Sequence, residues 1–129
     1  MTHPIEVILL RELADHLAMP IFVVDASGDL LFYNDPAEKL LGCRFDETGM
    51  MPFAEWSTLF TPTDEQGAPI APDDLPLAIA VQQHIPAHGG MWIMGLDGAR
   101  RQLTITAIPL EGQWGDHLGA AAIFWEQQT

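Results

Sequence analysis

The residues of this chain that could carry chemistry are few, and their spacing favours no reaction. The single cysteine, Cys43, can form no internal disulfide, which fits a reducing compartment, and it cannot supply the several thiolates of a structural zinc site. The five histidines are scattered, and the one pair at a helical ligand spacing, His84 and His88, is interrupted by Pro86. We therefore predict no metal site.

Motifs for covalent or acid–base catalysis are missing from the sequence as well. It has no Gly-x-Ser-x-Gly elbow and no phosphate-binding glycine loop, and its two serines, Ser27 and Ser57, have turn or cap explanations. The acidic pairs Asp64-Glu65 and Asp73-Asp74 are typical of a loop and of a helix start, and not of two placed carboxylates. We therefore predict that the protein is not an enzyme.

The composition excludes two classes of partner. Five lysines and arginines stand against 18 aspartates and glutamates, which gives a net charge of −13 at pH 7. Nucleic acids and anionic membranes are both bound through cationic side chains, so we expect neither partner. No apolar run approaches the roughly 20 residues of a membrane-spanning helix, and the start at Met1 lacks the basic region of a secretory signal. We therefore expect a cytoplasmic protein, whose acidity serves solubility or matches a basic partner.

The elements that must position any site are indicated by hydrophobic periodicity and turn residues. They predict one domain of the α+β class at 19–129, preceded by an amphipathic helix at 1–18. Asn34 or Asp35 is expected to cap one helix and Asp73-Asp74 another. Helices are expected at 4–18, 35–41, a short stretch after Pro52, and 75–84, with strands at 21–25, 30–33, 91–94, 102–110 and 118–125, and with the rest of 43–72 irregular.

Short motifs along the chain resemble those of a PAS domain, over about residues 13 to 126. Their order and spacing carry the resemblance, and no single motif does. They are Ile21-Phe22-Val23-Val24-Asp25, Gly28, Leu31-Phe32-Tyr33-Asn34, Ala37, Leu40-Leu41-Gly42, Gly67-Ala68-Pro69-Ile70, Asp74-Leu75-Pro76-Leu77, Leu96-Asp97-Gly98, Pro109-Leu110 and Gly119-Ala120.

The resemblance implies a five-stranded antiparallel sheet, with small helices on one face, around a small pocket. PAS domains bind small ligands or cofactors there, or bind nothing and mediate dimerisation, and a helix before the domain commonly pairs two copies. They usually precede an effector such as a kinase, cyclase or phosphatase, and this sequence contains none. We therefore expect a homodimeric sensory or interaction module that acts on an effector protein in trans, or that is part of a longer chain.

The resemblance also raises two cofactors, neither of which the sequence favours. Haem-binding PAS domains use a histidine of the helix expected at 75–84 as the iron ligand, and His84 falls near that position. A haem-binding gas or redox sensor is therefore the alternative function. The string Gly42-Cys43-Arg44-Phe45 resembles the Asn-Cys-Arg-Phe of flavin-binding light sensors, but it follows a different helix, and Asp46 stands where those sensors have glutamine.

Apolar side chains that flank a PAS pocket are the candidate ligand-binding residues. Alternate residues of a strand face opposite sides, and we expect Trp92 and Met94 to face inward. The opposite parity, Met91 and Ile93, is equally apolar, so this strand is a candidate for burial on both faces. An ordinary filled core is the alternative to a pocket. The candidate set is Phe22, Val24, Leu40, Trp56, Ile79, His84, Trp92, Met94, Leu103, Ile105 and Phe124.

The outer face of the expected sheet is the candidate dimer interface. Ile108, Ile123 and Trp125 are expected to make this face apolar, and extended apolar surfaces mark interfaces, most often of two-fold homodimers. The helix at 4–18 is expected to pack on the sheet of its own or of the partner subunit. The candidate interface residues are Ile5, Ile8, Leu9, Leu13, Ile123 and Trp125.

Overall fold

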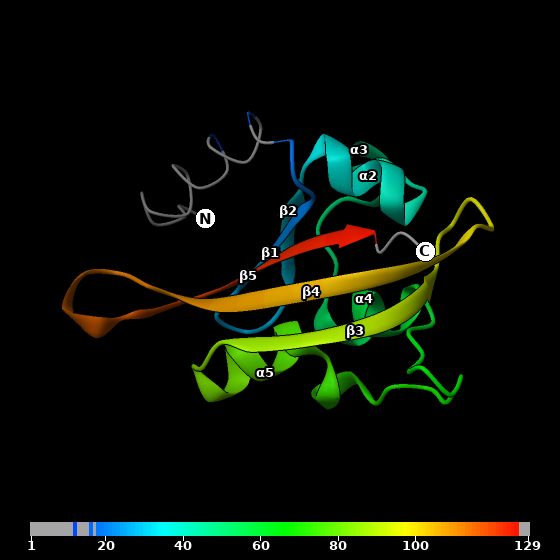
Figure 1. Ribbon diagram of the computed structural model, residues 1–129. Helices are drawn as coiled ribbons and strands as arrows, with labels where there is room; N and C mark the ends of the chain where they lie inside the picture. The colour runs from blue at the N-terminus through cyan, green and yellow to red at the C-terminus, as the bar shows by residue number, and fades with distance from the viewer. Residues whose placement is uncertain (1–11, 13–15, 17, 127–129) are drawn as a thin grey trace.

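The structure, a computed structural model, describes residues 12, 16 and 18–126. These residues form a five-stranded antiparallel sheet of order β2-β1-β5-β4-β3, which confirms the predicted α+β class (Figure 1). The predicted helix at 4–18 lies outside the described residues, apart from Glu12, His16 and Ala18. The strands are β1 (Ile21–Asp25), β2 (Leu30–Tyr33), β3 (Ala87–Met94), β4 (Arg100–Glu111) and β5 (His117–Glu126).

Asn34 joins the first hairpin to the first helix, α2 (Asp35–Leu41). Its buried side-chain oxygen accepts hydrogen bonds from the backbone N–H of Ile21 at 3.0 Å and of Ala37 at 3.2 Å. Its amide nitrogen donates to the carbonyl of Met19 at 2.8 Å. The predicted cap is therefore confirmed at Asn34, which also holds the start of β1 in place.

The tip of the β3–β4 hairpin packs on the carboxyl end of α2. The backbone N–H of Leu96 donates to the carbonyl of Leu41 at 2.8 Å, and the Arg101 guanidinium donates to the carbonyl of Leu40 at 2.9 Å. Gly42 ends the helix with a φ of 76°, and a Cβ there would lie 2.5 Å from the backbone nitrogen of Asp97. Glycine is therefore required at position 42 both by the turn and by the close approach of the hairpin.

The segment 43–72 is more helical than predicted. The expected helix after Pro52 is present as α4 (Phe53–Leu59), but α3 (Phe45–Thr48) was missed. No side chain caps α3, and it is held by tertiary contacts instead. The Phe45 N–H donates to a Glu38 carboxylate oxygen at 2.7 Å, and the Phe45 ring packs edge-on against Tyr33.

The expected cap at Asp73-Asp74 is wrong. These residues lie in a 3-10 turn, η1 (Pro72–Asp74), and α5 (Pro76–Gln83) starts after Leu75 with no side-chain cap. The Asp73 carboxylate instead accepts a hydrogen bond from Gln82 at 3.1 Å. Pro76 in the first turn of α5 has no backbone N–H that would need a capping partner, which explains how the helix begins without a side-chain cap.

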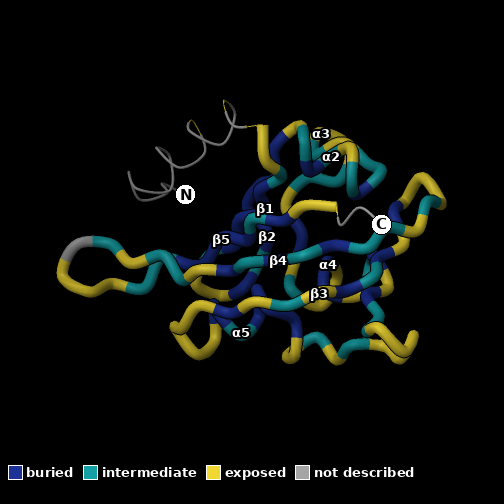
Figure 2. The backbone as a smooth tube through the Cα atoms, in the orientation of Figure 1, coloured by how far each residue is buried: buried dark blue, intermediate teal, exposed yellow. Residues whose placement is uncertain are grey.

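Apolar clusters lie on both faces of the sheet, and the buried residues of its strands are dark blue in Figure 2. The larger cluster lies between the inner face and the helices α4 and α5, and includes Phe22, Trp56 and Leu77. A smaller one lies on the outer face of β1, β2 and β5, and includes Val23, Phe32 and Ala121. The sheet is thus buried on both sides over β2, β1 and β5, while outward side chains of β3 and β4 reach the surface.

Candidate functional site

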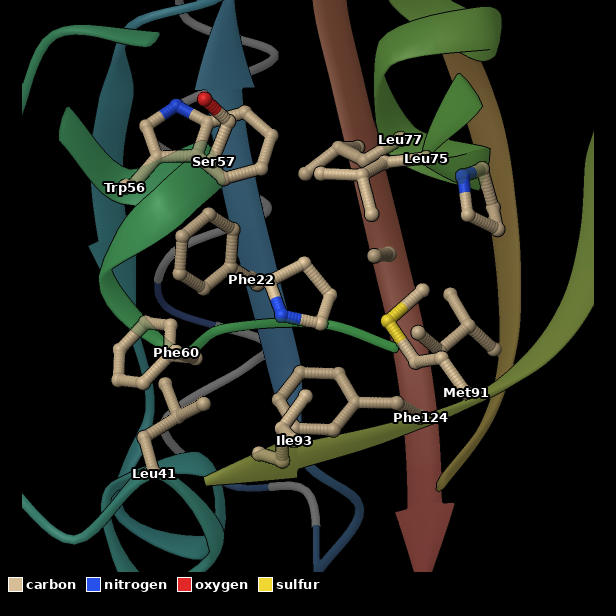
Figure 3. Close-up of a pocket in the computed structure, with 14 residues that line it drawn as sticks. Phe22, Leu41, Trp56, Ser57, Phe60, Leu75, Leu77, Met91, Ile93 and Phe124 are labelled. Carbon is tan, nitrogen blue, oxygen red and sulfur yellow. The ribbon is translucent and has the colours of Figure 1, made fainter. Parts of the chain in front are cut away.

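A cavity of about 80 Å³ lies within the inner core, between the sheet and the helices α4 and α5 (Figure 3). Strands β1, β3, β4 and β5 supply one wall, and α2, α4, α5 and the segments beside α4 and α5 supply the other. The lining residues are Phe22, Leu41, Trp56, Ser57, Phe60, Pro62, Leu75, Pro76, Leu77, Met91, Ile93, Ile105, Ala122 and Phe124.

Aromatic rings give the cavity a stiff wall. The indole N–H of Trp56, in α4, donates to the carbonyl of Gly28 at 2.8 Å, which fixes the indole ring against the β1–β2 turn. The Trp56 ring also packs edge-on against Phe22, with 5.3 Å between ring centroids. Ala122 of β5 presents only a methyl group to the cavity.

The wall of the cavity is apolar, and the Ser57 hydroxyl beside it is buried away from the open space. Ser57 is 2% exposed, and its Oγ has no hydrogen-bond partner among the described residues. The lining set contains no charged side chain, and the part of the chain that is described holds no cluster of three or more potential metal ligands. The arrangement can accommodate a small apolar body.

The structure brings four of the predicted ligand-binding residues together. Phe22, Trp56, Ile105 and Phe124 line the cavity. Val24 and Leu103 are buried in the same core, but they do not line it. Leu40 and Ile79 are half-buried and also lie away from the cavity wall.

The predicted orientation of β3 is wrong. Met91 and Ile93 line the cavity, whereas Trp92 is half-buried on the opposite face and Met94 is 41% exposed. Met91 pairs with Leu103 across the sheet, so both point into the core, while the Arg100 guanidinium stacks on the outward Trp92 ring at 4.4 Å from its centroid. The expectation that this strand is buried on both faces fails at Met94.

The residues around the cavity do not fit haem. His84 follows α5 in a left-handed conformation with a φ of 59°, is exposed, and stacks on the His117 ring at 3.8 Å. Pockets for drug-sized ligands measure about 300–1,000 Å³, and this cavity measures about 80 Å³. His84 is therefore not placed to hold an iron in the cavity.

The residues do not fit a flavin either. The Cys43 sulfur lies 3.2 Å from the Tyr33 hydroxyl, outside the residues that line the cavity. Burial and the nearby carboxylates of Glu47 and Glu38 raise the pKa of this thiol, which keeps it in the poorly nucleophilic protonated form. Desolvation likewise raises the pKa of Tyr33 well above its usual value.

A second surface of interest is the outer face of β3, β4 and β5. Ile108 is 39% exposed and Trp125 is 41% exposed, while Ile123 is half-buried and packs against the outer cluster. Trp125 pairs with Thr104, and Ile123 with Thr106, so these side chains share one face. Ile5, Ile8, Leu9 and Leu13 lie outside the described residues.

The fold agrees with comparisons to known proteins. The PAS domain family model matches residues 8–80, and the chain belongs to the PAS domain family. No curated protein matches it at a significant level. PAS domains are sensory and interaction modules in signalling, and generally not enzymes. Among the described residues, no helix is long and apolar enough to cross a membrane.

Solved structures share this fold across nearly the whole chain. The PAS domain of a Colwellia psychrerythraea protein is 17% identical, covers 95% of this chain and 97% of its own, and has a TM-score of 0.64. The PAS domain of the fruit-fly ELK potassium channel is 11% identical over 99% and 100% of the two chains, with a TM-score of 0.72. A Rhodobacter sphaeroides LOV protein is 12% identical over 97% of this chain and 69% of its own, with a TM-score of 0.74. These likenesses establish the fold.

Proposed function

We propose that this protein is a homodimeric PAS module of the cytoplasm, which senses a small apolar ligand and acts on an effector protein. The effector is a separate protein or a further domain of a longer chain. The ligand occupies the cavity, and the dimer forms through the outer face of the sheet. A ligand with different affinities for two dimer arrangements would shift their populations, which is how binding would reach the effector.

The observation that carries the proposal is the apolar outer face of β4 and β5. Ile108 and Trp125 are partly exposed and stand beside the buried outer cluster that includes Val23 and Ala121. A partner bound over Ile108 and Trp125 would continue the apolar packing that the outer cluster already provides on β1, β2 and β5. A second copy of the chain is the favoured partner, because two-fold homodimers are the commonest closed assembly.

The N-terminal helix predicted at 4–18 is the second part of the proposed interface. Its apolar residues Ile5, Leu9 and Leu13 recur at one side of a helix. If they form the dimer seam, replacing all three with glutamate yields a monomer. A dimer that persists with these three changes removes the helix from the interface.

The sheet part of the interface is tested by sedimentation of single-residue variants. Ile108→Glu and Trp125→Glu should each give a folded monomer, since a carboxylate in an apolar interface loses its hydration without gaining a partner. Trp114→Glu is the matched control, because Trp114 is 95% exposed in η2 (Gln113–Gly115), in the β4–β5 connection that extends away from the helices (Figure 1). A wild-type monomer, or dimeric variants at both sheet positions, contradicts the proposed interface.

A further inference from the structure

We propose that a recess beside the outer face of β3 binds a short-chain monocarboxylate, and that Arg100 holds the carboxylate group of this ligand. The recess measures about 150 Å³ and lies between the end of β3, the start of β4 and the segment that follows α4. Its lining shares only Ile93 with the lining of the core cavity. It is therefore a site separate from the cavity and from the ligand proposed for it.

Arg100 brings a permanent positive charge to the recess. Its guanidinium carbon lies 4.4 Å from the centroid of the Trp92 ring, and this stacking orients the guanidinium plane. No described carboxylate pairs with Arg100, whereas the neighbouring Arg101 pairs with Asp97. The N–H groups of Arg100 are therefore available to a planar anion, and a carboxylate fits their geometry.

The other polar side chains of this region leave the charge of Arg100 uncompensated. Asp64, in the segment after α4, uses its carboxylate within its own turn, where it accepts hydrogen bonds at 2.9 Å from the N–H groups of Gln66 and Ala68. Thr61 and Thr63 line the recess, and among the described residues their hydroxyls have no hydrogen-bond partner. The polar groups of the recess are thus not consumed by the fold itself.

The remaining part of the recess is apolar and determines the tail of the ligand. Trp92 is half-buried and Met94 is 41% exposed, and both side chains belong to the lining. Each methylene group that a ligand buries against such side chains adds to its affinity. The ligand therefore combines one carboxylate with a short apolar tail.

The volume of the recess and the charge of the protein limit the ligand further. A space of about 150 Å³ is known to hold benzene, so about six non-hydrogen atoms fit. Arg100 is the one described cation in the lining, and the whole chain carries a net charge of −13. This charge disfavours ligands with several negative charges. A monocarboxylate such as butyrate has the matching size and charge.

A free small molecule, and not a peptide strand, is the favoured source of the carboxylate. The edge of β3 beside the recess is already paired, because Trp92 and Thr63 exchange two backbone hydrogen bonds of 2.9 Å. The N–H of Met94 likewise donates to the carbonyl of Phe60 at 2.8 Å. A partner peptide therefore cannot add to this part of the sheet through main-chain hydrogen bonds.

The test is an NMR titration of the full chain, at pH 7 and constant ionic strength, followed by the indole N–H signals. The probes are butyrate and butanamide, which have the same number of non-hydrogen atoms and differ in charge. Trp92 reports the recess, Trp56 the core cavity, and Trp125 the outer surface of β5. Butyrate should shift the Trp92 signal with a dissociation constant of about 1–10 mM. Butanamide should bind about fivefold more weakly because it lacks the charge, and acetate about fivefold more weakly because it lacks two methylene groups.

The role of Arg100 is tested by Arg100→Gln, with Arg44→Gln as the matched control. Arg44 is exposed and pairs with Asp46, so its loss changes the net charge by the same amount outside the recess. Arg100→Gln should weaken butyrate binding about fivefold and remove the preference over butanamide, while Arg44→Gln leaves both unchanged. An equal loss in the two variants would assign the effect to net charge and overturn the role of Arg100.

The wild-type titration alone can also overturn the proposal. Equal affinities for butyrate and butanamide would contradict recognition of the charge, and a response of Trp56 or Trp125 without one of Trp92 would contradict the location. N-acetylglutamate methylamide carries the carboxylate on a peptide unit and should bind more weakly than butyrate. Tighter binding of this probe would assign the recess to an acidic side chain of a partner protein and overturn the small-molecule source. None of these outcomes bears on the core cavity or on dimerisation.

Discussion

At the scale of single residues, Asn34 joins three segments of the chain through one buried amide. Its oxygen accepts hydrogen bonds from the start of β1 and from the first turn of α2, and its nitrogen donates one to the segment before β1. The type of side chain was readable from the sequence as a helix cap. The bonds to Ile21 and Met19 were not, because they span 13 and 15 residues.

Replacing Asn34 with alanine should therefore cost more than an ordinary cap. We expect Asn34→Ala to lower the free energy of unfolding by about 2–3 kcal/mol, since the cap contributes about 1 kcal/mol and two further buried groups lose their partner. Urea denaturation measures the change. Asp35→Ala, at the exposed neighbouring position, should cost only about 0.5 kcal/mol. A loss below about 1 kcal/mol for Asn34→Ala would contradict the threefold role of this amide.

At the scale of elements, the β3–β4 hairpin is joined to α2 by Arg101. Its guanidinium pairs with Asp97 at 2.9 Å and also donates to the carbonyl of Leu40. The hydrogen bond from Arg101 is the main reason that the pKa of Asp97 is lowered to about 2. This contact joins β4 to the carboxyl end of α2, two elements that both supply side chains to the cavity wall.

The acid stability of the fold should report this contact. Because the pKa of Asp97 is lower in the folded than in the unfolded chain, its contribution is complete above about pH 4 and is lost as the pH falls toward 2. Asp97→Asn should be less stable than the wild type at pH 7, and the difference should vanish near pH 2. Asp46→Asn is the control, since Asp46 pairs with an exposed Arg44. A difference that stays constant with pH would contradict the role of the charge.

At the scale of the whole molecule, charge and apolar surface act in opposite directions. Each copy carries a net charge of −13, so two copies repel each other, while the proposed interface is apolar. Salt screens this repulsion, with a Debye length of about 10 Å at 0.1 M and about 3 Å at 1 M. The proposed dimer is therefore expected to depend on ionic strength.

Raising sodium chloride from about 0.1 M to about 1 M should strengthen the dimer. Analytical ultracentrifugation across this range measures the dissociation constant, which we expect to fall about tenfold or more. Trp125→Glu serves as the control and should stay monomeric throughout. A dimer that weakens with salt would show that ion pairs, and not the apolar outer face, hold the two copies together.

Part of the candidate site was predictable, and part was not. Phe22, Trp56, Ile105 and Phe124 were predicted because large apolar side chains in these elements must face the core. The inward face of β3 was predicted wrongly, because Trp92 and Met94 are as apolar as Met91 and Ile93 and alternation alone cannot choose between them. Ser57 was given a turn or cap explanation, but it lies within α4.

The sequence by itself determined four of the strands, the second half of β3, the helices α2, α4 and α5, and the family, because those signals are local. Apolar runs, the turn at Gly28 and the caps at Asn34 and Gly42 each act over a few neighbouring residues. The tertiary structure alone decided which face of β3 turns inward, that α3 forms, and that an apolar cavity remains between the sheet and the helices. These features depend on side chains that come together from elements far apart in the chain, and their packing energy is not encoded in any single segment.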